Sequence, residues 1–282
     1  MNIPIDSILI PTDYSDLSES ALKVGLAIAK RQMAEVTILN VVDRLSYFPP
    51  NKVFSSDFRM TPNIFSTVGE KLQELTSIIE KESGIKVTGK IMEGRTSDLI
   101  CQLAFEENIS LIVMGTHGTS GMRDLFIGSE AIGVVKNATC PVLTIPGNWN
   151  KTDFAKVLFP VRMNPEILAK YFYSRPIIEK NNSKLFLLGL SEQKYSGDLK
   201  EIAFLMDKIK IQLHNDKVVY QSAICQSKDF PGETIKISKE YEIDLIVLSS
   251  NFDNDFNPYN LGPFAQQVLN HSHLPVLSIK SL

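Results

Sequence analysis

The chain has 282 residues, of which 44% are hydrophobic and 22% are charged, and its formal net charge at pH 7 is -3. This composition is typical of a globular protein with a substantial core and excludes a mainly disordered chain. Since there is no basic excess and no long block of Lys or Arg, nucleic acid is not an expected partner.

The cysteines and the start of the chain indicate a cellular location. Cys101, Cys140 and Cys225 lack the spacing of a zinc site or of a disulfide framework, so we expect buried thiols in a reducing compartment. The opening MNIPIDSILIPTD has no basic segment before a long apolar one, and no apolar run is long enough to cross a membrane. We therefore expect a cytoplasmic protein without a membrane partner.

A buried strand over 7–11 and an amphipathic helix are the first elements that the apolar pattern predicts. Pro11, Thr12 and Asp13 then lie at the carboxyl end of a strand, which is the edge where parallel α/β sheets bind ligands. Asp13 is also a suitable cap for the helix that follows, and the residues alone leave both roles open.

A second strand is predicted over 36–42, and an irregular segment over 44–67 follows it. This segment holds several aromatic residues, and a loop of such length is usually a lid, a binding surface or disordered, with plain packing of the aromatic residues as an equal alternative. The next helix has apolar residues on one face and ends at Gly84, a residue type that is common just past a helix.

A third strand is predicted around 85–91, and a helix follows it after three candidate caps, Thr96, Ser97 and Asp98. Strands and helices thus alternate with short connections. This alternation predicts an α/β fold with a doubly wound parallel sheet.

A glycine-rich connection links the buried strand that begins at Leu111 to a predicted helix. Its spacing is G-x-x-G, then nine residues, then G-S, at Gly115, Gly118, Gly128 and Ser129. Glycines in a strand-to-helix loop let backbone N–H groups approach an anion, and the helix adds the positive end of its dipole. The pattern predicts a phosphate-binding loop, although a plain connection whose serine caps the helix is the alternative. It matches neither the Lys-containing P-loop nor the Rossmann glycine pattern.

This loop resembles that of the universal stress proteins, whose nucleotide-binding members carry G-x-x-G-x9-G-[ST] after the fourth strand. The opening ILIPTDYSDLSESAL and the closing CPVLTI extend the resemblance over the first half of the chain. It implies a five-stranded parallel sheet of order 3-2-1-4-5 that binds ATP, with or without Mg²⁺, and ADP and AMP are alternatives. The implied contacts are Pro11, Thr12, Asp13, the main chain of Val41, Met114, Gly115, His117, Gly118, Gly128, Ser129 and Glu130.

The second half of the chain repeats the first. A shift of 149 residues aligns Pro11 with Pro160 and Asp13 with Arg162, and a shift of 134 aligns CPVLTI with LPVLSI. The second copy is thus 15 residues shorter, and the aromatic loop is where we expect the loss. A period of this length indicates two copies of one domain rather than a solenoid. The expected domains are 1–148 and 154–282, which pair with each other in one chain or, alternatively, support a homodimer.

The glycine pattern is not kept in the second copy. The aligned residues are Ser249, Phe252, Gly262 and Pro263, and the segment also adds Asp253 and Asp255. Proline has no N–H to donate, and the carboxylates repel an anion. We expect one nucleotide site, in a regulatory protein of the universal stress type. A slow ATPase or phosphotransferase and a non-binding scaffold are the alternatives. We predict no catalytic residue and no metal ligand, since only Arg95, His117 and Arg123 lie near the loop as chemical groups.

Overall fold

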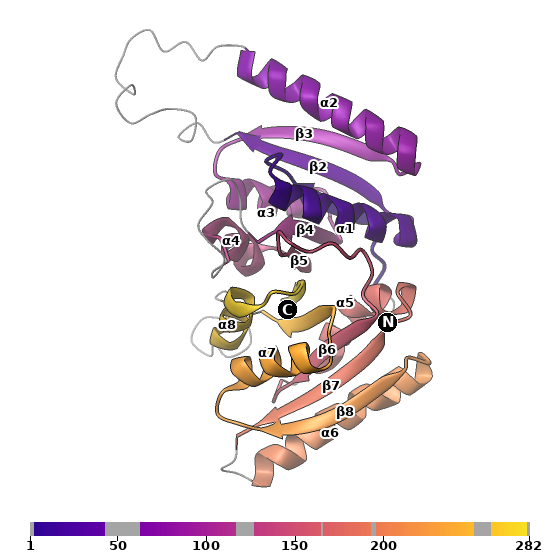
Figure 1. Ribbon diagram of the computed structural model, residues 1–282, viewed down its shortest axis with the longest axis vertical. Coiled ribbons are helices and arrows are strands. Elements are labelled where there is room, and N and C mark those ends of the chain that lie inside the picture. The colour runs from indigo at the N-terminus through magenta and orange to yellow at the C-terminus, as the bar shows by residue number, and fades with distance from the viewer. Residues whose placement is uncertain are drawn as a thin grey trace, which may run out of the picture.

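The computed structural model describes residues 3–42, 63–116, 127–164, 166–192, 196–250 and 261–280. Strands and helices alternate along the chain, as predicted (Figure 1). The first half contains β1 (Ser7–Pro11), α1 (Asp16–Gln32), β2 (Glu35–Val42), α2 (Asn63–Ser83), β3 (Val87–Glu93), α3 (Thr96–Glu106), β4 (Leu111–Gly115), α4 (Ser129–Asn137) and β5 (Val142–Ile145). The second half contains β6 (Lys156–Val161), α5 (Ile167–Lys180), β7 (Lys184–Ser191), α6 (Ser196–Asn215), β8 (Tyr220–Gln226), α7 (Phe230–Glu240), β9 (Leu245–Ser249), α8 (Pro263–His271) and β10 (Val276–Ile279).

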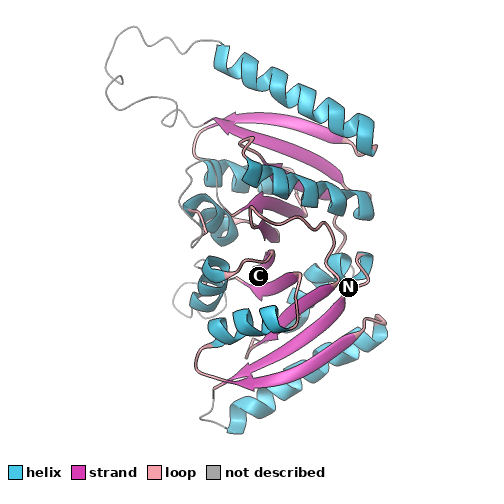
Figure 2. Ribbon diagram, in the orientation of Figure 1, coloured by secondary structure: helices cyan, strands magenta, loops and turns pink. Residues whose placement is uncertain are grey.

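The two halves have the same strand order. It is β3-β2-β1-β4-β5 in the first half and β8-β7-β6-β9-β10 in the second, and all pairs within a half are parallel. The predicted order 3-2-1-4-5 is therefore confirmed. The halves join through an antiparallel pair of β5 and β10, with Leu143 opposite Leu277, which makes one sheet of ten strands (Figure 2).

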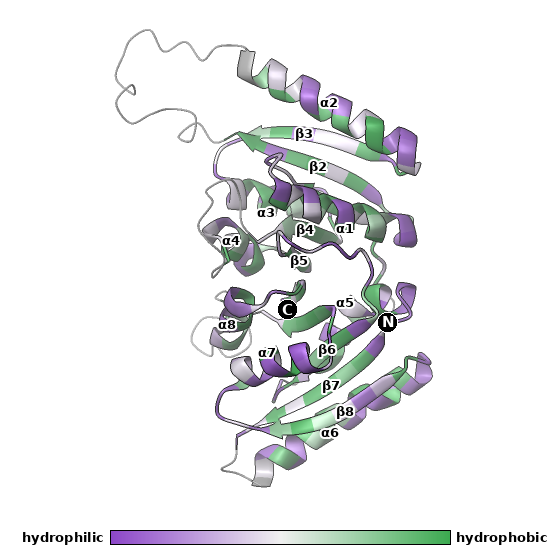
Figure 3. Cartoon of the chain, viewed as in Figure 1, coloured by the Kyte–Doolittle hydropathy of each residue, from purple (hydrophilic) through white to green (hydrophobic). Residues whose placement is uncertain are grey.

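Helices cover both faces of this sheet. One face carries a hydrophobic cluster with α1, α2, α5 and α6, and the other carries a cluster with α3, α4, α7 and α8. Successive strand residues alternate between the clusters: Ile8 and Ile10 face the first, and Leu9 faces the second. Because both faces are buried, the central strands are apolar along their length, whereas the helices are amphipathic (Figure 3).

Hydrogen bonds confirm the alignment of the two halves. Pro11 is opposite Leu39 and Pro160 is opposite Leu188, a difference of 149 in both cases. The connection between β2 and α2 spans 43–62, whereas that between β7 and α6 spans only 192–195. The difference in length between the two halves therefore falls at the position of the aromatic loop, as expected.

Two sequence-based boundaries need correction, and a third position agrees with its prediction. The helix α2 begins at Asn63, so the end of the predicted loop 44–67 is helical, while 43–62 lies outside the described residues. Strand β3 begins at Val87 rather than 85, because Ile85 turns back through a hydrogen bond from its N–H to the Ser83 hydroxyl (3.1 Å). Gly84 has a φ of 69°, which agrees with its predicted position after α2.

The connection between the halves is packed rather than a loose polar linker. Phe154 is fully buried, and its carbonyl accepts a hydrogen bond from the Ser183 hydroxyl at 2.5 Å. The Arg31 guanidinium of α1 donates to the Thr152 carbonyl at 2.7 Å. These contacts fix the connection against both halves.

The three cysteines are free and half-buried. Burial raises the pKa of the Cys101 thiol to about 11 and that of the Cys140 thiol to about 12. Both thiols are therefore protonated at neutral pH, which is typical of unreactive cysteines.

Candidate functional site

The carboxyl ends of β1, β2 and β4 meet at one edge of the first half. β1 pairs with β2 on one side and with β4 on the other, so the strand order reverses there. Ligands of open α/β sheets bind at such a reversal. The structure thus brings the residues after β1 and the residues after β4, both predicted site segments, to the same edge.

The turn after β1 holds Asp13 in place. The buried Thr12 hydroxyl lies 3.1 Å from that of Ser18 and accepts the Tyr14 N–H at 3.1 Å. The Asp13 carboxylate accepts the N–H of Ser15 at 3.0 Å and its hydroxyl at 2.5 Å. Ser15 is the N-cap of α1, so Asp13 orients the cap instead of forming it. The carboxylate itself is on the exposed side of the turn.

The main chain of Val41 faces the space beyond β1. The Leu39 carbonyl accepts the Thr12 N–H at 2.8 Å, and β1 ends at this level. Backbone groups two residues apart in a strand point to the same side, so the N–H and C=O of Val41 also point toward the Asp13 turn. This is the position that the expected main-chain contact with a base requires.

The first turn of α4 offers unpaired N–H groups. Gly128 is its N-cap, with no side chain, and the Gly128 N–H donates to the Thr116 carbonyl at 2.7 Å. Within the described residues, the N–H groups of Ser129, Glu130 and Ala131 have no protein acceptor, as is usual at a helix N-terminus. Together with the helix dipole they fit an anion such as a phosphate.

Two predicted site residues use their side chains elsewhere. Met114 is buried in the core, so only its main chain can reach a ligand. The Glu130 carboxylate accepts the Ser97 N–H at 2.6 Å, at the start of α3. None of the predicted caps serves α3, because its N-cap is Arg95, whose side chain makes no capping hydrogen bond. Glu130 takes over this task and fixes α4 against α3. His117 and Gly118 lie outside the described residues.

The equivalent edge of the second half has the same backbone and different side chains. The Gly262 N–H donates to the Ser250 carbonyl at 2.7 Å, as Gly128 does to Thr116. Arg162, which aligns with Asp13, lies between two aromatic rings: its guanidinium carbon is 5.1 Å from the Phe230 ring centre and 4.8 Å from that of Phe264. The edge is therefore filled by protein side chains. Phe252, Asp253 and Asp255 lie outside the described residues.

A buried lysine, which the sequence analysis did not identify, lies beneath Arg162. Lys170 of α5 is only 4% exposed, and its ammonium donates to the Pro160 carbonyl at 2.5 Å. Burial, assisted by the positive charge of Arg162, lowers the pKa of Lys170 to about 7. The small cavity that Arg162 and Lys170 share has a volume of about 10 Å³, which is room for one water molecule. Lys170 aligns with the core residue Ala21 of the first half. A lysine at a position that is apolar in the other copy is the sequence signal that identifies it.

Two features are absent from the described part of the chain. No group of three or more His, Cys, Asp or Glu residues in it is arranged to hold a metal ion. No helix in this part combines the length and the apolar composition that a membrane crossing requires.

Comparisons with known proteins bear on the family and on the fold. The chain is 36% identical to the universal stress protein MJ0531 of Methanocaldococcus jannaschii over 138 residues, 49% of this chain and 80% of that protein. It is 30% identical to the universal stress protein YxiE of Bacillus subtilis over 150 residues, 50% of this chain and 98% of that protein. A universal stress protein structure from Archaeoglobus fulgidus shares the fold, with a TM-score of 0.75 over 98% of each chain at 21% identity. The model of the universal stress protein family matches residues 4–146, half of the chain, and the chain belongs to this family.

Proposed function

We propose that this chain is a nucleotide-binding regulatory protein that holds one ATP molecule at the first-half edge. The observation that carries the proposal is the difference between two edges with the same backbone. The first has unpaired N–H groups at α4, next to Gly128, whereas Arg162, Phe230 and Phe264 fill the second. Selection for a scaffold without a ligand would not require the two edges to differ in this way.

Each part of the nucleotide has a matching group in the first half. The N–H groups at the start of α4 and the Ser129 hydroxyl suit the phosphates. The exposed Asp13 carboxylate suits the hydroxyls of the ribose, and the main chain of Val41 suits the edge of the base. Because most of these groups belong to the backbone, they fit ADP and AMP as well, with fewer contacts.

We expect one ATP per chain although the fold is duplicated. Isothermal titration calorimetry of the full chain with ATP should give a stoichiometry near one, and the same titrations with ADP and AMP should rank the three nucleotides. A repeat with EDTA in place of Mg²⁺ would show whether the metal contributes. Two equivalent sites would contradict the assignment of the second edge, and the absence of binding would favour the scaffold.

We expect slow or absent hydrolysis of the bound ATP. Phosphoryl transfer depends on a metal, Lys or Arg placed at the reacting phosphate. In the described part of the first-half edge, the Arg95 guanidinium lies 3.9 Å from the Asp98 carboxylate at the exposed start of α3, and the Lys71 ammonium lies 4.0 Å from the centre of the Tyr14 ring, next to Asp13. Neither cation is shown at the start of α4, where the phosphates are expected. Phosphate release should stay well below the rate of a typical enzyme, roughly 1 per second or more. A rate in that range would establish the ATPase alternative instead.

A further inference from the structure

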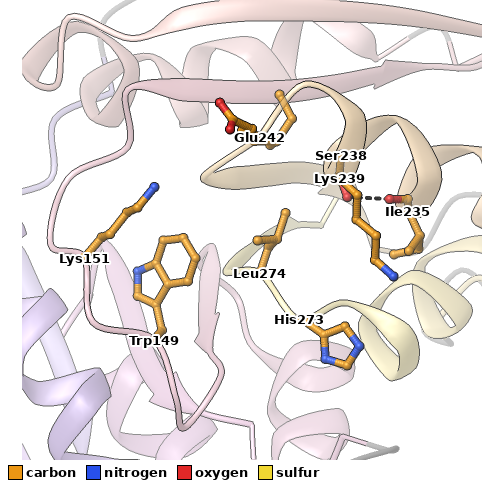
Figure 4. A pocket seen from close by; sticks show the side chains of 9 residues that line it. Trp149, Lys151, Ile235, Ser238, Lys239, Glu242, His273 and Leu274 are labelled. Atoms are coloured by element: carbon orange, nitrogen blue, oxygen red, sulfur yellow. Dashed lines mark hydrogen bonds between the residues drawn. The ribbon is translucent and has the colours of Figure 1, made fainter.

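A second cavity lies in the second half, at the amino-terminal ends of its strands. Its volume is about 330 Å³, within the range of small-molecule sites. Three segments form it: the connection at Trp149 and Lys151, the end of α7 with the residues that follow it, and the turn at His273 and Leu274 (Figure 4). Ile243 and Leu274 precede β9 and β10, and none of the residues that line the cavity belongs to the proposed nucleotide site.

The walls of this cavity are mainly apolar and are held in place. Trp149 packs against the main core, and Ile235, Ile243 and Leu274 provide aliphatic surface around it. The Lys151 ammonium bonds to the buried Asp244 carboxylate at 2.6 Å, and Asp244 also accepts the Lys156 N–H at 2.9 Å. These bonds fix the segment that carries Trp149, so the indole forms a preformed wall for a flat apolar group.

Among the described side chains that line the cavity, one cation has no ionic partner. Lys151 is paired with Asp244, and Glu242 is paired with the Lys156 ammonium at 3.0 Å. The Lys239 ammonium makes no hydrogen bond or ion pair within the described part of the chain, and the residue lines the cavity together with His273. In Figure 4 these two side chains lie on the same side, across from Lys151. An acidic group of a ligand would find its counter-charge there.

We propose that this cavity is a second ligand site, which takes a small aromatic anion of the arene carboxylate or sulfonate class. The ring system lies against Trp149 and Leu274, and the acidic group faces Lys239 and His273. Because Lys239 is exposed, its part in the affinity is modest and decreases with salt. The proposal does not depend on nucleotide binding in the first half.

The probe that tests this site is 8-anilinonaphthalene-1-sulfonate, titrated into the full chain with saturating ATP present. Trp149 is the only tryptophan of the chain, so energy transfer from the indole to the probe reports binding next to it. We expect saturable energy transfer. N-phenyl-1-naphthylamine, the same ring system without the sulfonate, should bind more weakly.

Lys239→Met should lower the affinity for the sulfonate probe about three- to fivefold, which is the effect expected for the loss of an exposed ion pair. Its matched control is Lys236→Met, on the same helix, since Lys236 pairs with Glu233 at 3.4 Å and does not line the cavity. The control should bind as the unchanged chain does. No energy transfer, or equal affinity of the sulfonate for the unchanged chain and for Lys239→Met, would overturn the proposal.

Discussion

Lys170→Met is expected to stabilise the protein by roughly 3 to 5 kcal/mol at pH 6 to 7. In the folded chain the pKa of Lys170 is about 7, against an ordinary value of 10.5, because burial and the charge of Arg162 disfavour the ammonium. Each pKa unit corresponds to about 1.4 kcal/mol. Methionine fills nearly the same volume without a charge, and its loss of the hydrogen bond to the Pro160 carbonyl offsets only about 1 kcal/mol of the gain.

The same pKa difference fixes how this effect depends on pH. Between about pH 7 and 10.5 the folded chain holds Lys170 neutral, whereas the unfolded chain binds the proton. The unfolded state thus binds more protons, so the contribution of Lys170 to stability improves as the pH rises through this window and is lost as the pH falls. The advantage of Lys170→Met should therefore shrink to less than about 1 kcal/mol near pH 10.5.

Urea unfolding of the unchanged chain and of Lys170→Met, at several pH values from 6 to 10.5, would measure both the sign and the size. The Lys170 side-chain nitrogen lies 4.0 Å from the centre of the Phe159 ring. Lys208→Met is the matched control, because Lys208 also lies over an aromatic ring, 4.4 Å from the centre of Phe204, but is exposed. Its effect should stay within about 0.5 kcal/mol at every pH. A destabilised Lys170→Met, or a difference that does not change with pH, would contradict a neutral buried lysine.

Much of the fold could be predicted because its signals are local. Buried strands appear as short apolar runs, helices as apolar stripes, and Gly84 ends a helix as its residue type suggests. The internal repeat predicted two copies of one unit, and the resemblance to the universal stress proteins supplied the strand order. The edge that joins Asp13 to Gly128 follows from that order.

What could not be predicted depends on contacts between distant residues. The helix α3 has three local candidates for a cap, yet Glu130, 33 positions away, takes the Ser97 N–H. The local sequences of β5 and β10 do not predict their antiparallel pairing, since any buried strand can pair with another strand at its free edge. Lys170 is missed because a pattern of apolar residues treats every lysine as exposed.

Ser129→Pro is expected to weaken ATP binding at least about a hundredfold while the fold is retained. The substitution removes the Ser129 N–H and the hydroxyl, and each hydrogen bond to a charged group contributes roughly 1.5 to 3 kcal/mol, or about tenfold or more in affinity. The second half already has a proline at the aligned position, because α8 begins with Pro263. Gly128 has φ -63° and ψ 151°, and Gly262 before Pro263 has φ -69° and ψ 145°. Both conformations suit a residue that precedes proline, and proline is common in the first turn of a helix.

Two more variants separate the contributions at this position. Ser129→Ala removes only the hydroxyl and should weaken ATP binding about tenfold. The reciprocal Pro263→Ser restores a donor in the second half but should create no ATP site, because Arg162, Phe230 and Phe264 still fill that edge. Calorimetry with ATP gives the affinities, and thermal unfolding without nucleotide shows that the three variants keep the fold. If Ser129→Pro is folded and binds ATP with unchanged affinity, the nucleotide does not contact the start of α4 and the proposed site is wrong.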